Sequence, residues 1–392
     1  MSLRGKMISF VLLCAIFGWR WTSFDQLLPE SWTSESEVRY TVRILEQPEH
    51  TDSQTIIRDG RWKIMLWGYR PLTVGKEYTF SGRVEPDVLM GKQVRIVMMD
   101  PRIEMVGVSH NSPVRVGEKV IIWLSRMRER MVDNLSSWLP EPHSSLSAGI
   151  LLGVRRRMPY SFYQQLVSTG TLHIIAASGY NVTIVARVVM GVLLVMFSRG
   201  VAIVGGILAI MAYIVVAGGS AAVVRSGIMG SLALLAYYWG REAEAKRLLW
   251  VTVWVMLLVQ PLMLLDVGFQ LSVCATVGLL YLEPWVRGWV GRGHGRTRGS
   301  APTGLENYLN EYWWPTVAAT LATMPVIYLT FGRVSWISPI VNMFVLPLTP
   351  LIMFLSAVAV GVGALIPALG QVVGWVLYVP LWMMVEVIGL FG

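Results

Sequence analysis

Long apolar runs dominate the chain from residue 172 onward. Each is about 20 residues long, the length that a helix needs to cross the ~30 Å hydrocarbon core of a bilayer. We therefore expect a polytopic α-helical membrane domain over residues 144–392, in which Pro380 favours a break within the last span. The expected spans lie near residues 176–197, 201–217, 221–239, 248–265, 269–286, 314–331, 337–360 and 369–391.

A shorter apolar stretch begins at Met7 and runs into Trp19 and Trp21. The small-residue pattern of a signal-peptide cleavage site is missing there, and tryptophans suit the membrane interface. Residues 1–24 are therefore expected to form an uncleaved membrane anchor, which brings the expected total to about nine spans.

Residues 34–117 show a different pattern, with short alternating runs separated by turn signals. Asp59-Gly60 lies between two of these runs and is typical of a hairpin turn. The pattern predicts a small all-β domain, most simply an OB-like barrel, although a small β-sandwich would show the same pattern. The expected strands are Val38–Leu45, Ser53–Ile57, Arg61–Trp67, Glu77–Val84 and Gln93–Met98.

Residues 119–139 form an amphipathic pattern, with apolar side chains at a spacing of three to four and basic side chains between them. This spacing predicts a helix with one apolar face. Two interpretations stay open: the helix lies on the membrane surface, or it packs against the β domain.

Composition excludes an ordinary soluble enzyme, because 54% of the residues are hydrophobic and only 15% are charged. The net charge of +9 does not mark a basic nucleic-acid domain, since residues 25–119 hold 13 Lys/Arg against 14 Asp/Glu. The excess positive charge therefore belongs to the membrane part. Cys14 and Cys274 both lie in apolar runs, which excludes a disulfide framework.

The basic residues at the ends of the spans all fall on one side of the expected topology. The positive-inside rule makes that side cytoplasmic, so the N-terminus lies inside, and the β domain and the C-terminus lie outside. These residues are Arg4, Lys6, Arg199, Arg241, Lys246, Arg247, Arg287, Arg292, Arg296 and Arg298.

Polar side chains gather in the outer halves of the spans, where they suit a vestibule open to the outside. Each also has a structural interpretation: Arg225 extends to headgroups, Ser178-Gly179 is a helix contact, Gln270 bonds a neighbouring helix, and Asp266 caps a helix. The candidates are His173, Ser178, Gly179, Asn181, Arg225, Asp266, Gln270, Ser272 and Asn342.

Arg187 lies in the middle of a span, where a charge is costly. If the helix runs from His173, then His173, Tyr180 and Arg187 share one face that suits phosphates; alternatively, Arg187 pairs with Asp266 or Glu283 inside the bundle. The basic run Arg155, Arg156 and Arg157 lies on the outer side, where it meets an anionic ligand or lipid headgroups.

The sequence holds no P-loop and no H-E-x-x-H, and its five His are scattered. We therefore expect no nucleotide-driven motor, no metal, no cofactor and no enzymatic activity. His173 and Ser178 are five residues apart, so a hydrolytic pair would need a third partner and a break in the helix.

The segment Gly170–Val182, with the sequence GTLHIIAASGYNV, closely resembles the signature of ComEC-type competence proteins. Ala148–Gly153, Ser220–Arg225, Gly268–Ser272 and Asn342 with Pro347 resemble further family motifs in the same order. Many members have His where this chain has Asn181, and an acidic residue where it has Val154-Arg155. Larger members carry a C-terminal metallo-β-lactamase-like domain, so the chain resembles a short form without it.

The resemblance implies an inner-membrane channel for the uptake of single-stranded DNA during natural transformation. It also implies a cytoplasmic ATPase or helicase motor, an external DNA receptor and contact with membrane lipid, with the chain acting as a monomer or a homo-oligomer. Two alternatives remain: a transporter of another anionic polymer or solute, and an intramembrane hydrolase.

Overall fold

The computed structural model describes the chain from residue 37 to its end, with several internal gaps. The described residues are 37–44, 48–51, 54–59, 62–67, 72–89, 92–105, 116–154, 158–175, 179–240, 244–293, 308–332 and 334–392. The chain divides into two compact units, one formed by Met1–Glu129 with Trp254–Leu265 and the other by Arg130–Val253 with Asp266–Gly392. The expected anchor at residues 1–24 lies outside the described residues.

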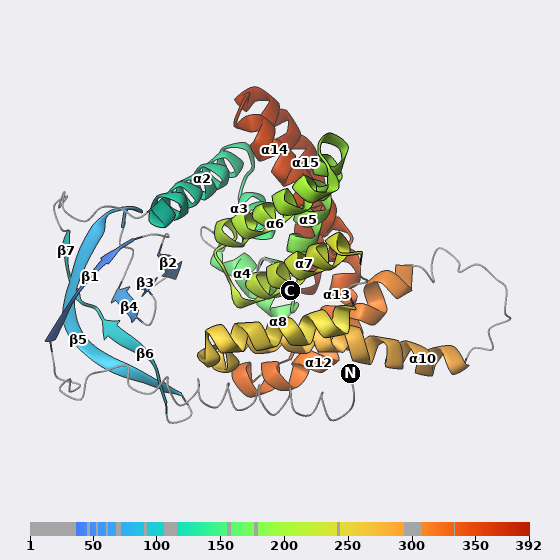
Figure 1. Cartoon of the computed structure of the whole chain (residues 1–392), viewed down its shortest axis with the longest axis horizontal. Helices are drawn as coiled ribbons and strands as arrows, with labels where there is room; N and C mark the ends of the chain where they lie inside the picture. Colours follow the sequence, from blue (N-terminus) through green and yellow to red (C-terminus); the bar gives the residue numbers. More distant parts are fainter. Residues whose placement is uncertain are drawn as a thin grey trace. The chain divides into compact units, whose positions relative to one another are not determined.

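The first unit holds a small sheet (Figure 1), and each expected strand is present in it. The described strands are β1 (Glu37–Arg43), β2 (Glu49–Thr51), β3 (Gln54–Asp59), β4 (Trp62–Trp67), β5 (Glu77–Leu89), β6 (Lys92–Met99) and β7 (Arg102–Met105). Their order is β1-β5-β6-β4-β3-β2, with β7 paired to β5. The pairing of β4 with β6 is parallel, and Asp59 faces Trp62 in the antiparallel β3–β4 hairpin, as the turn signal predicts.

Alternating burial explains why these segments form strands. Val38 and Val42 of β1 are buried between exposed or half-buried neighbours, and Tyr78 and Phe80 of β5 follow the same period of two. These side chains meet one core, which also contains Ile44, Ile57, Ile64, Leu66, Val74, Val84, Met98 and Ile122.

The amphipathic segment forms α2 (Val116–Trp138), close to the expected bounds. Ile122 is buried in the core of the first unit, and Leu135 is buried in the core of the second unit. Burial at these positions favours the packing interpretation of the helix. Trp123 nevertheless remains 61% exposed, so part of the apolar face is not covered by this chain.

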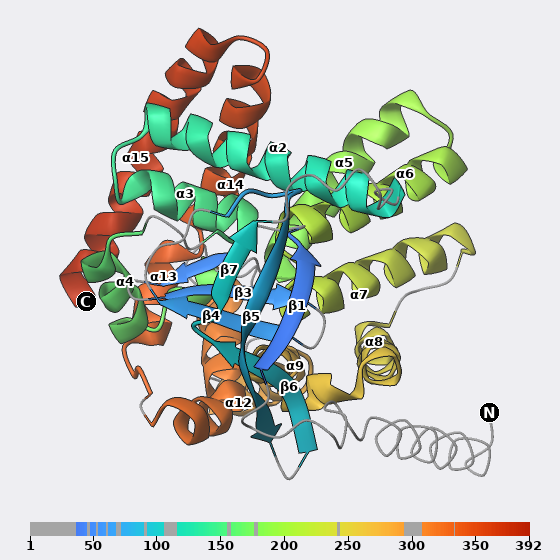
Figure 2. The same ribbon diagram turned by 90° about the vertical axis from the view of Figure 1, so that its left-hand side faces the viewer.

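The rest of the described chain is helical, and most of it belongs to the second unit. Its elements are α3 (His143–Leu152), α4 (Tyr160–Ser168), η1 (Leu172–Ile174), α5 (Gly179–Met196), α6 (Arg199–Val216), α7 (Ala221–Tyr238), α8 (Ala245–Val259), η2 (Pro261–Leu265), α9 (Val267–Val277), η3 (Gly278–Leu282), α10 (Glu283–Gly293), η4 (Leu309–Trp313), α12 (Trp314–Phe331), α13 (Ser338–Val345), α14 (Leu348–Gly363) and α15 (Pro367–Phe391). In Figure 2, α3, α4 and α15 lie together and α5, α6 and α7 form another group.

Six helical segments among the described residues are long and apolar enough to cross a membrane, and α13 with α14, bent by 46°, would make a seventh. These six segments are Leu172–Met196, Arg199–Val216, Ala221–Tyr238, Val267–Gly288, Glu311–Phe331 and Pro367–Phe391. The described part of the chain therefore does not reach the expected nine spans.

Proline chemistry explains most of the differences from the expected spans. The expected span 248–265 divides into α8 and η2 at Pro261, because proline lacks the N–H that would continue the helical hydrogen bonds. The expected span 337–360 divides at Pro347 for the same reason. Pro380, by contrast, is accommodated inside the unbroken α15, so the break expected there is absent.

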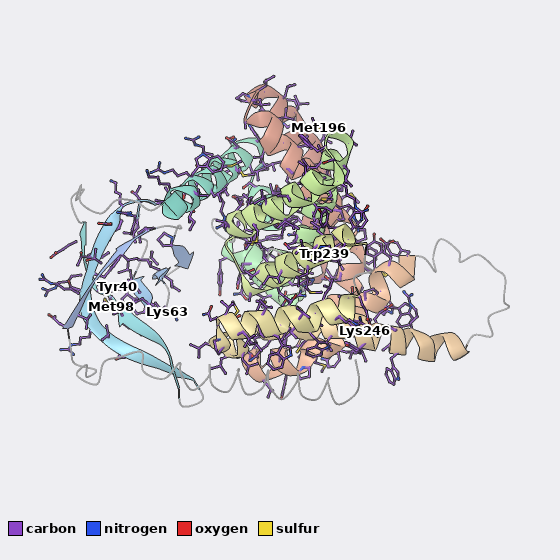
Figure 3. The ribbon with its side chains drawn as sticks, viewed as in Figure 1. Tyr40, Lys63, Met98, Met196, Trp239 and Lys246 are labelled. Carbon is purple, nitrogen blue, oxygen red and sulfur yellow. The ribbon has the colours of Figure 1, made fainter. Side chains whose placement is uncertain are left out.

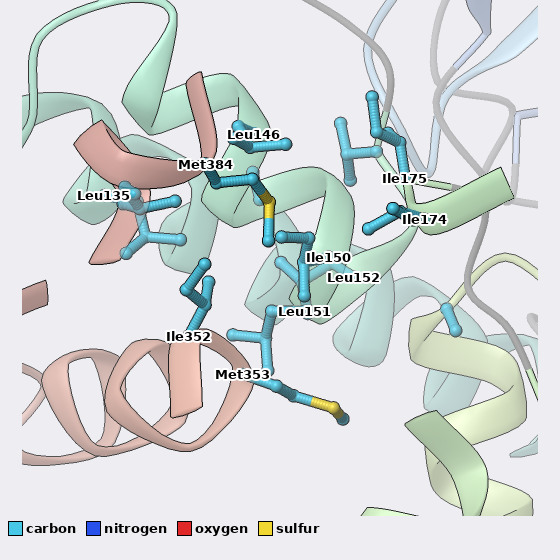
Figure 4. Packing of buried hydrophobic residues seen from close by; sticks show 14 of the residues in the cluster. Leu135, Leu146, Ile150, Leu151, Leu152, Ile174, Ile175, Ile352, Met353 and Met384 are labelled. Atoms are coloured by element: carbon cyan, nitrogen blue, oxygen red, sulfur yellow. The ribbon is translucent and has the colours of Figure 1, made fainter. Parts of the chain in front are cut away.

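The core of the second unit surrounds α3, a helix that hydropathy did not predict. Every residue of α3 is buried, although Ser144, Ser145 and Ser147 are polar. Figure 4 shows Leu146 and Ile150 of α3 packed among Leu135, Ile352 and Met384 from other helices. Protein, rather than lipid, therefore surrounds α3.

A notch of three glycines receives the indole of Trp138 in the second unit. A Cβ atom built on Gly363, Gly370 or Gly374 would lie 2.1, 2.7 or 3.2 Å from the nearest Trp138 atom. On Gly370 it would also lie 2.5 Å from the Cα atom of Gly363. Only glycine permits this approach of α14, α15 and the end of α2.

Gly370→Ala is expected to lower the thermal unfolding temperature of the detergent-purified protein. The added methyl group meets backbone as well as the indole, and such overpacking costs about 1–3 kcal/mol. Gly389→Ala, on the same helix with nothing within 4 Å of the new Cβ, is the matched control and should unfold no earlier than wild type. Equal unfolding temperatures for the two variants would contradict the notch.

Candidate functional site

Arg225 is the most unusual polar residue of the second unit. It lies on α7, and only 7% of its surface is exposed. Its Nε donates to the Ser272 hydroxyl at 2.9 Å, and its other nitrogens donate to Met229 Sδ at 3.2 Å and Ser226 Oγ at 3.3 Å. Because the side chain is buried, it does not extend to the headgroups as one interpretation of the sequence proposed.

None of these Arg225 partners carries a negative charge, and no carboxylate of the described residues forms an ion pair with its guanidinium. A buried charge normally has a counterion, since desolvation costs several kcal/mol per ion. The guanidinium is held by neutral acceptors and retains its full positive charge, so the site is suited to an anion.

The start of α5 lies against this guanidinium. A Cβ atom built on Gly179 would lie 2.3 Å from Ser226 Oγ and 3.4 Å from an Nη atom of Arg225, so only glycine allows the contact. This contact packs α5 directly against the Arg225 side chain and Ser226.

The third element of the site is α9, which contributes Ser272. Asp266 is the N-cap of α9, and its carboxylate accepts a hydrogen bond from the Phe269 backbone N–H at 2.8 Å. The capping interpretation of Asp266 is thus confirmed. Gln270 is half-buried on the same helix, two residues before Ser272.

The expected stripe of His173, Tyr180 and Arg187 stays a prediction. His173 lies in the short 3₁₀ helix η1 and the other two residues lie in α5, while residues 176–178 between them lie outside the described residues. His173 is exposed, and its Nδ1 lies 3.0 Å from the Gly170 carbonyl oxygen.

Arg187 is exposed on α5 and has neither of the two partners considered for it. Glu283 pairs instead with Arg287 at 3.1 Å, and Asp266 caps its own helix. The buried ion pair expected as an alternative is therefore absent.

Asn181 takes a buried position behind the site, with 1% of its surface exposed. Its Nδ2 donates to the Ile150 carbonyl at 2.8 Å, and the Tyr213 hydroxyl donates to the neighbouring Leu151 carbonyl at 3.0 Å. Both bonds satisfy carbonyls in the last turn of α3, where the carbonyl oxygens lack an N–H donor within the helix. Asn181 thereby joins two of the family-like segments, and sequence reasoning gave no sign of Tyr213.

Asn342 is connected to the Gly170 turn through Ser338. Its Nδ2 donates to Ser338 Oγ at 3.1 Å, and Ser338 Oγ lies 3.4 Å from the Gly170 carbonyl oxygen. Gly170 has a φ of +71°, and a Cβ atom there would lie 2.8 Å from Ser338 Cβ, so the turn requires glycine. The structure thus brings Asn342 beside the turn that precedes His173 and not beside Arg225.

Two expected parts of the site lie outside the described residues: Ser178, and the basic run Arg155, Arg156 and Arg157. No group of three or more His, Cys, Asp or Glu suited to a metal ion occurs in the part of the chain that the structure describes.

The apolar helices and the small sheet define an α-helical membrane protein with a β domain near its N-terminus. The Competence protein family model matches residues 150–392, which is more than half of the chain. The chain belongs to this family, and membership indicates a role in DNA uptake in competence. No curated protein and no solved structure matches the chain.

Proposed function

We propose that the chain is a channel of the bacterial cytoplasmic membrane that carries single-stranded DNA into the cell during natural transformation. The observation that carries this proposal is the buried Arg225 guanidinium, which has no carboxylate partner among the described residues. A DNA phosphate supplies the missing negative charge. Arg is suited to this role because its planar guanidinium binds phosphate oxygens through two parallel hydrogen bonds.

The elements around Arg225 support transient binding rather than a permanent ion pair. The neutral hydroxyls of Ser226 and Ser272 orient the guanidinium without neutralising it. Conduction requires binding that is favourable enough for entry and weak enough for exit. The proposed path offers further polar contacts from His173, Ser178, Gln270 and Arg187. The helices that form the path are held in place by hydrogen bonds of Asn181, Asp266 and Asn342.

Basic and aromatic side chains at one end of the second unit support the proposed topology. Arg199 lies over the Tyr237 ring at 4.0 Å, and Lys246 lies over the Tyr281 ring at 4.8 Å. Figure 3 shows Met196, Trp239 and Lys246 at the same end of the helices. Tryptophan and tyrosine suit the membrane interface, and Lys and Arg suit its cytoplasmic side. We therefore assign this end to the cytoplasm, and the β domain and C-terminus to the outside.

The strand order supports an OB-like β domain. β1 pairs with β5, whereas β2 pairs with β3. Although β1 and β2 are close in the sequence, they therefore lie at opposite ends of the strand order. The Tyr40 ring of β1 stacks on the Trp62 ring of β4 at 4.1 Å, although these strands are not neighbours in the sheet. A sheet that curls toward closure explains both observations.

The proposed cycle needs partners that supply the DNA and the driving force. An external receptor delivers the strand, and a cytoplasmic ATPase or helicase draws it inward, because the chain itself holds no P-loop. The exposed apolar side chains of the helices contact membrane lipid. No catalytic step and no cofactor are part of the proposal.

Deletion of the gene is expected to stop labelled DNA from entering the cytoplasm while the DNA still reaches the cell surface. The measurement is nuclease-protected label in the deletion strain and in the strain complemented with the wild-type gene. Unchanged entry after deletion would overturn the proposal and favour transport of another anion. A Ser178→Ala variant that keeps Arg225 but loses all uptake would instead favour an intramembrane hydrolase.

A further inference from the structure

Tyr180 follows Gly179 directly, so it stands next to the site of the bound phosphate in the proposed function. Its side chain lies on α5 and is 48% exposed. Gly179 lies against the Arg225 guanidinium, and Tyr180 is close enough to Glu311 and Arg187 to interact electrostatically with both. The Cα atoms of consecutive residues are only 3.8 Å apart, which places both positions within reach of one nucleotide.

Two further tyrosines come to this place from the segment before α12, one in η4 and one just before it. The rings of Tyr308 and Tyr312 lie 5.0 Å apart at an angle of 49°, and Tyr312 interacts with both Tyr180 and Glu311. The Tyr308 hydroxyl donates to the Met343 carbonyl of α13 at 2.5 Å, which fixes that ring. Tyr180 and Tyr312, from segments far apart in the sequence, therefore both lie near Glu311, and the Tyr308 ring contacts that of Tyr312.

The charges divide this region into two parts. The Arg225 guanidinium attracts an anion, whereas the Glu311 carboxylate repels one from Tyr180 and Tyr312. An aromatic ring beside a carboxylate still accepts the uncharged face of a base. This arrangement suits a nucleotide whose phosphate lies toward Arg225 and whose base lies toward Tyr180.

We propose that Tyr180, with Tyr312 beside it, is a base-stacking platform for the nucleotide whose phosphate binds at Arg225. This inference rests on the proposed function and specifies its substrate. Only a strand with unpaired bases presents a free face to the platform, so the site selects single-stranded nucleic acid over duplex DNA and over a base-free polyanion. Stacking is tolerant of sequence, because every base has a π-face.

The test compares three probes on the purified full-length protein in detergent: labelled oligo-dT, an abasic oligonucleotide of equal length and charge, and polyphosphate. Tyr180→Leu should weaken oligo-dT binding about tenfold to a hundredfold and leave the other two probes unchanged, in line with the loss of one stacked base. Tyr180→Phe keeps the ring and should bind like wild type. Tyr328→Leu removes a tyrosine that is 62% exposed elsewhere on α12, and it is the matched control.

The outcomes separate the two proposals. If wild type binds oligo-dT and Tyr180→Leu binds it equally well, the platform is overturned and the DNA channel stands. If Tyr180→Leu weakens all three probes equally, the residue contributes no stacking and the platform is also overturned. If wild type binds no probe better than Arg225→Ala does, the proposed function itself fails. Tyr180→Gln provides a second ring deletion should Tyr180→Leu be poorly folded.

Discussion

Arg225→Ala is expected to reduce DNA entry into the cytoplasm by at least about a hundredfold, close to the level of the gene deletion. The substitution removes the buried cation of the site and leaves only the hydroxyls of Ser226 and Ser272. Truncating one partner of a buried charged contact typically costs 2–5 kcal/mol. Arg225→Lys keeps a charge but loses the planar fork, so it should transport at an intermediate rate. The measurement is nuclease-protected label together with the number of transformants.

Arg247→Ala is the matched control for Arg225→Ala. The Arg247 side chain is 84% exposed and pairs with Glu244 at 2.7 Å, so its loss should leave uptake near wild type. Both variants should insert at equal levels in membranes. The unfolding temperature gives an independent readout, because removing a buried charge without a counterion should not destabilise the fold. Wild-type uptake by Arg225→Ala, or its failure to accumulate, would contradict the assigned role.

Hydropathy predicted some helices well because it measures a property that lipid exposure requires. The expected spans 201–217 and 221–239 correspond closely to α6 and α7. The same reasoning missed α3, whose Ser147 hydroxyl forms a hydrogen bond of 2.8 Å with the Ser356 hydroxyl inside the protein. A polar residue that finds a partner in the core lowers hydropathy without leaving the core, so a window average cannot detect such a helix.

The candidate site shows a similar division. Depth along the spans grouped Gly179, Arg225 and Ser272, and the structure does bring them together. Depth also grouped Asn181 and Asn342 with them, but these two side chains point to Ile150 and Ser338 instead. The position of a residue along a span gives only its depth in the membrane. The direction of its side chain depends on helix rotation and on where each helix begins.

Gly179→Ala is expected to reduce DNA uptake at least tenfold through a single methyl group. The new Cβ atom would lie 2.3 Å from Ser226 Oγ and 3.3 Å from Ser226 Cβ, distances that side chains do not tolerate without movement. The Ser226 hydroxyl accepts a hydrogen bond from Arg225 at 3.3 Å, so its displacement also moves the guanidinium. The measurement is uptake of labelled DNA at matched levels of membrane protein.

Two further variants separate this steric effect from a general effect of alanine in α5. Gly191→Ala lies on the same helix with nothing within 4 Å of its Cβ atom, so it should keep full uptake and gain up to about 1 kcal/mol of helix stability. Ser226→Ala removes the hydroxyl that the new methyl group would meet, and in the double variant with Gly179→Ala it should restore part of the lost uptake. If the double variant stays as inactive as Gly179→Ala alone, then contact with Ser226 is not the cause, because among the described residues only Ser226 lies within 3 Å of the methyl group.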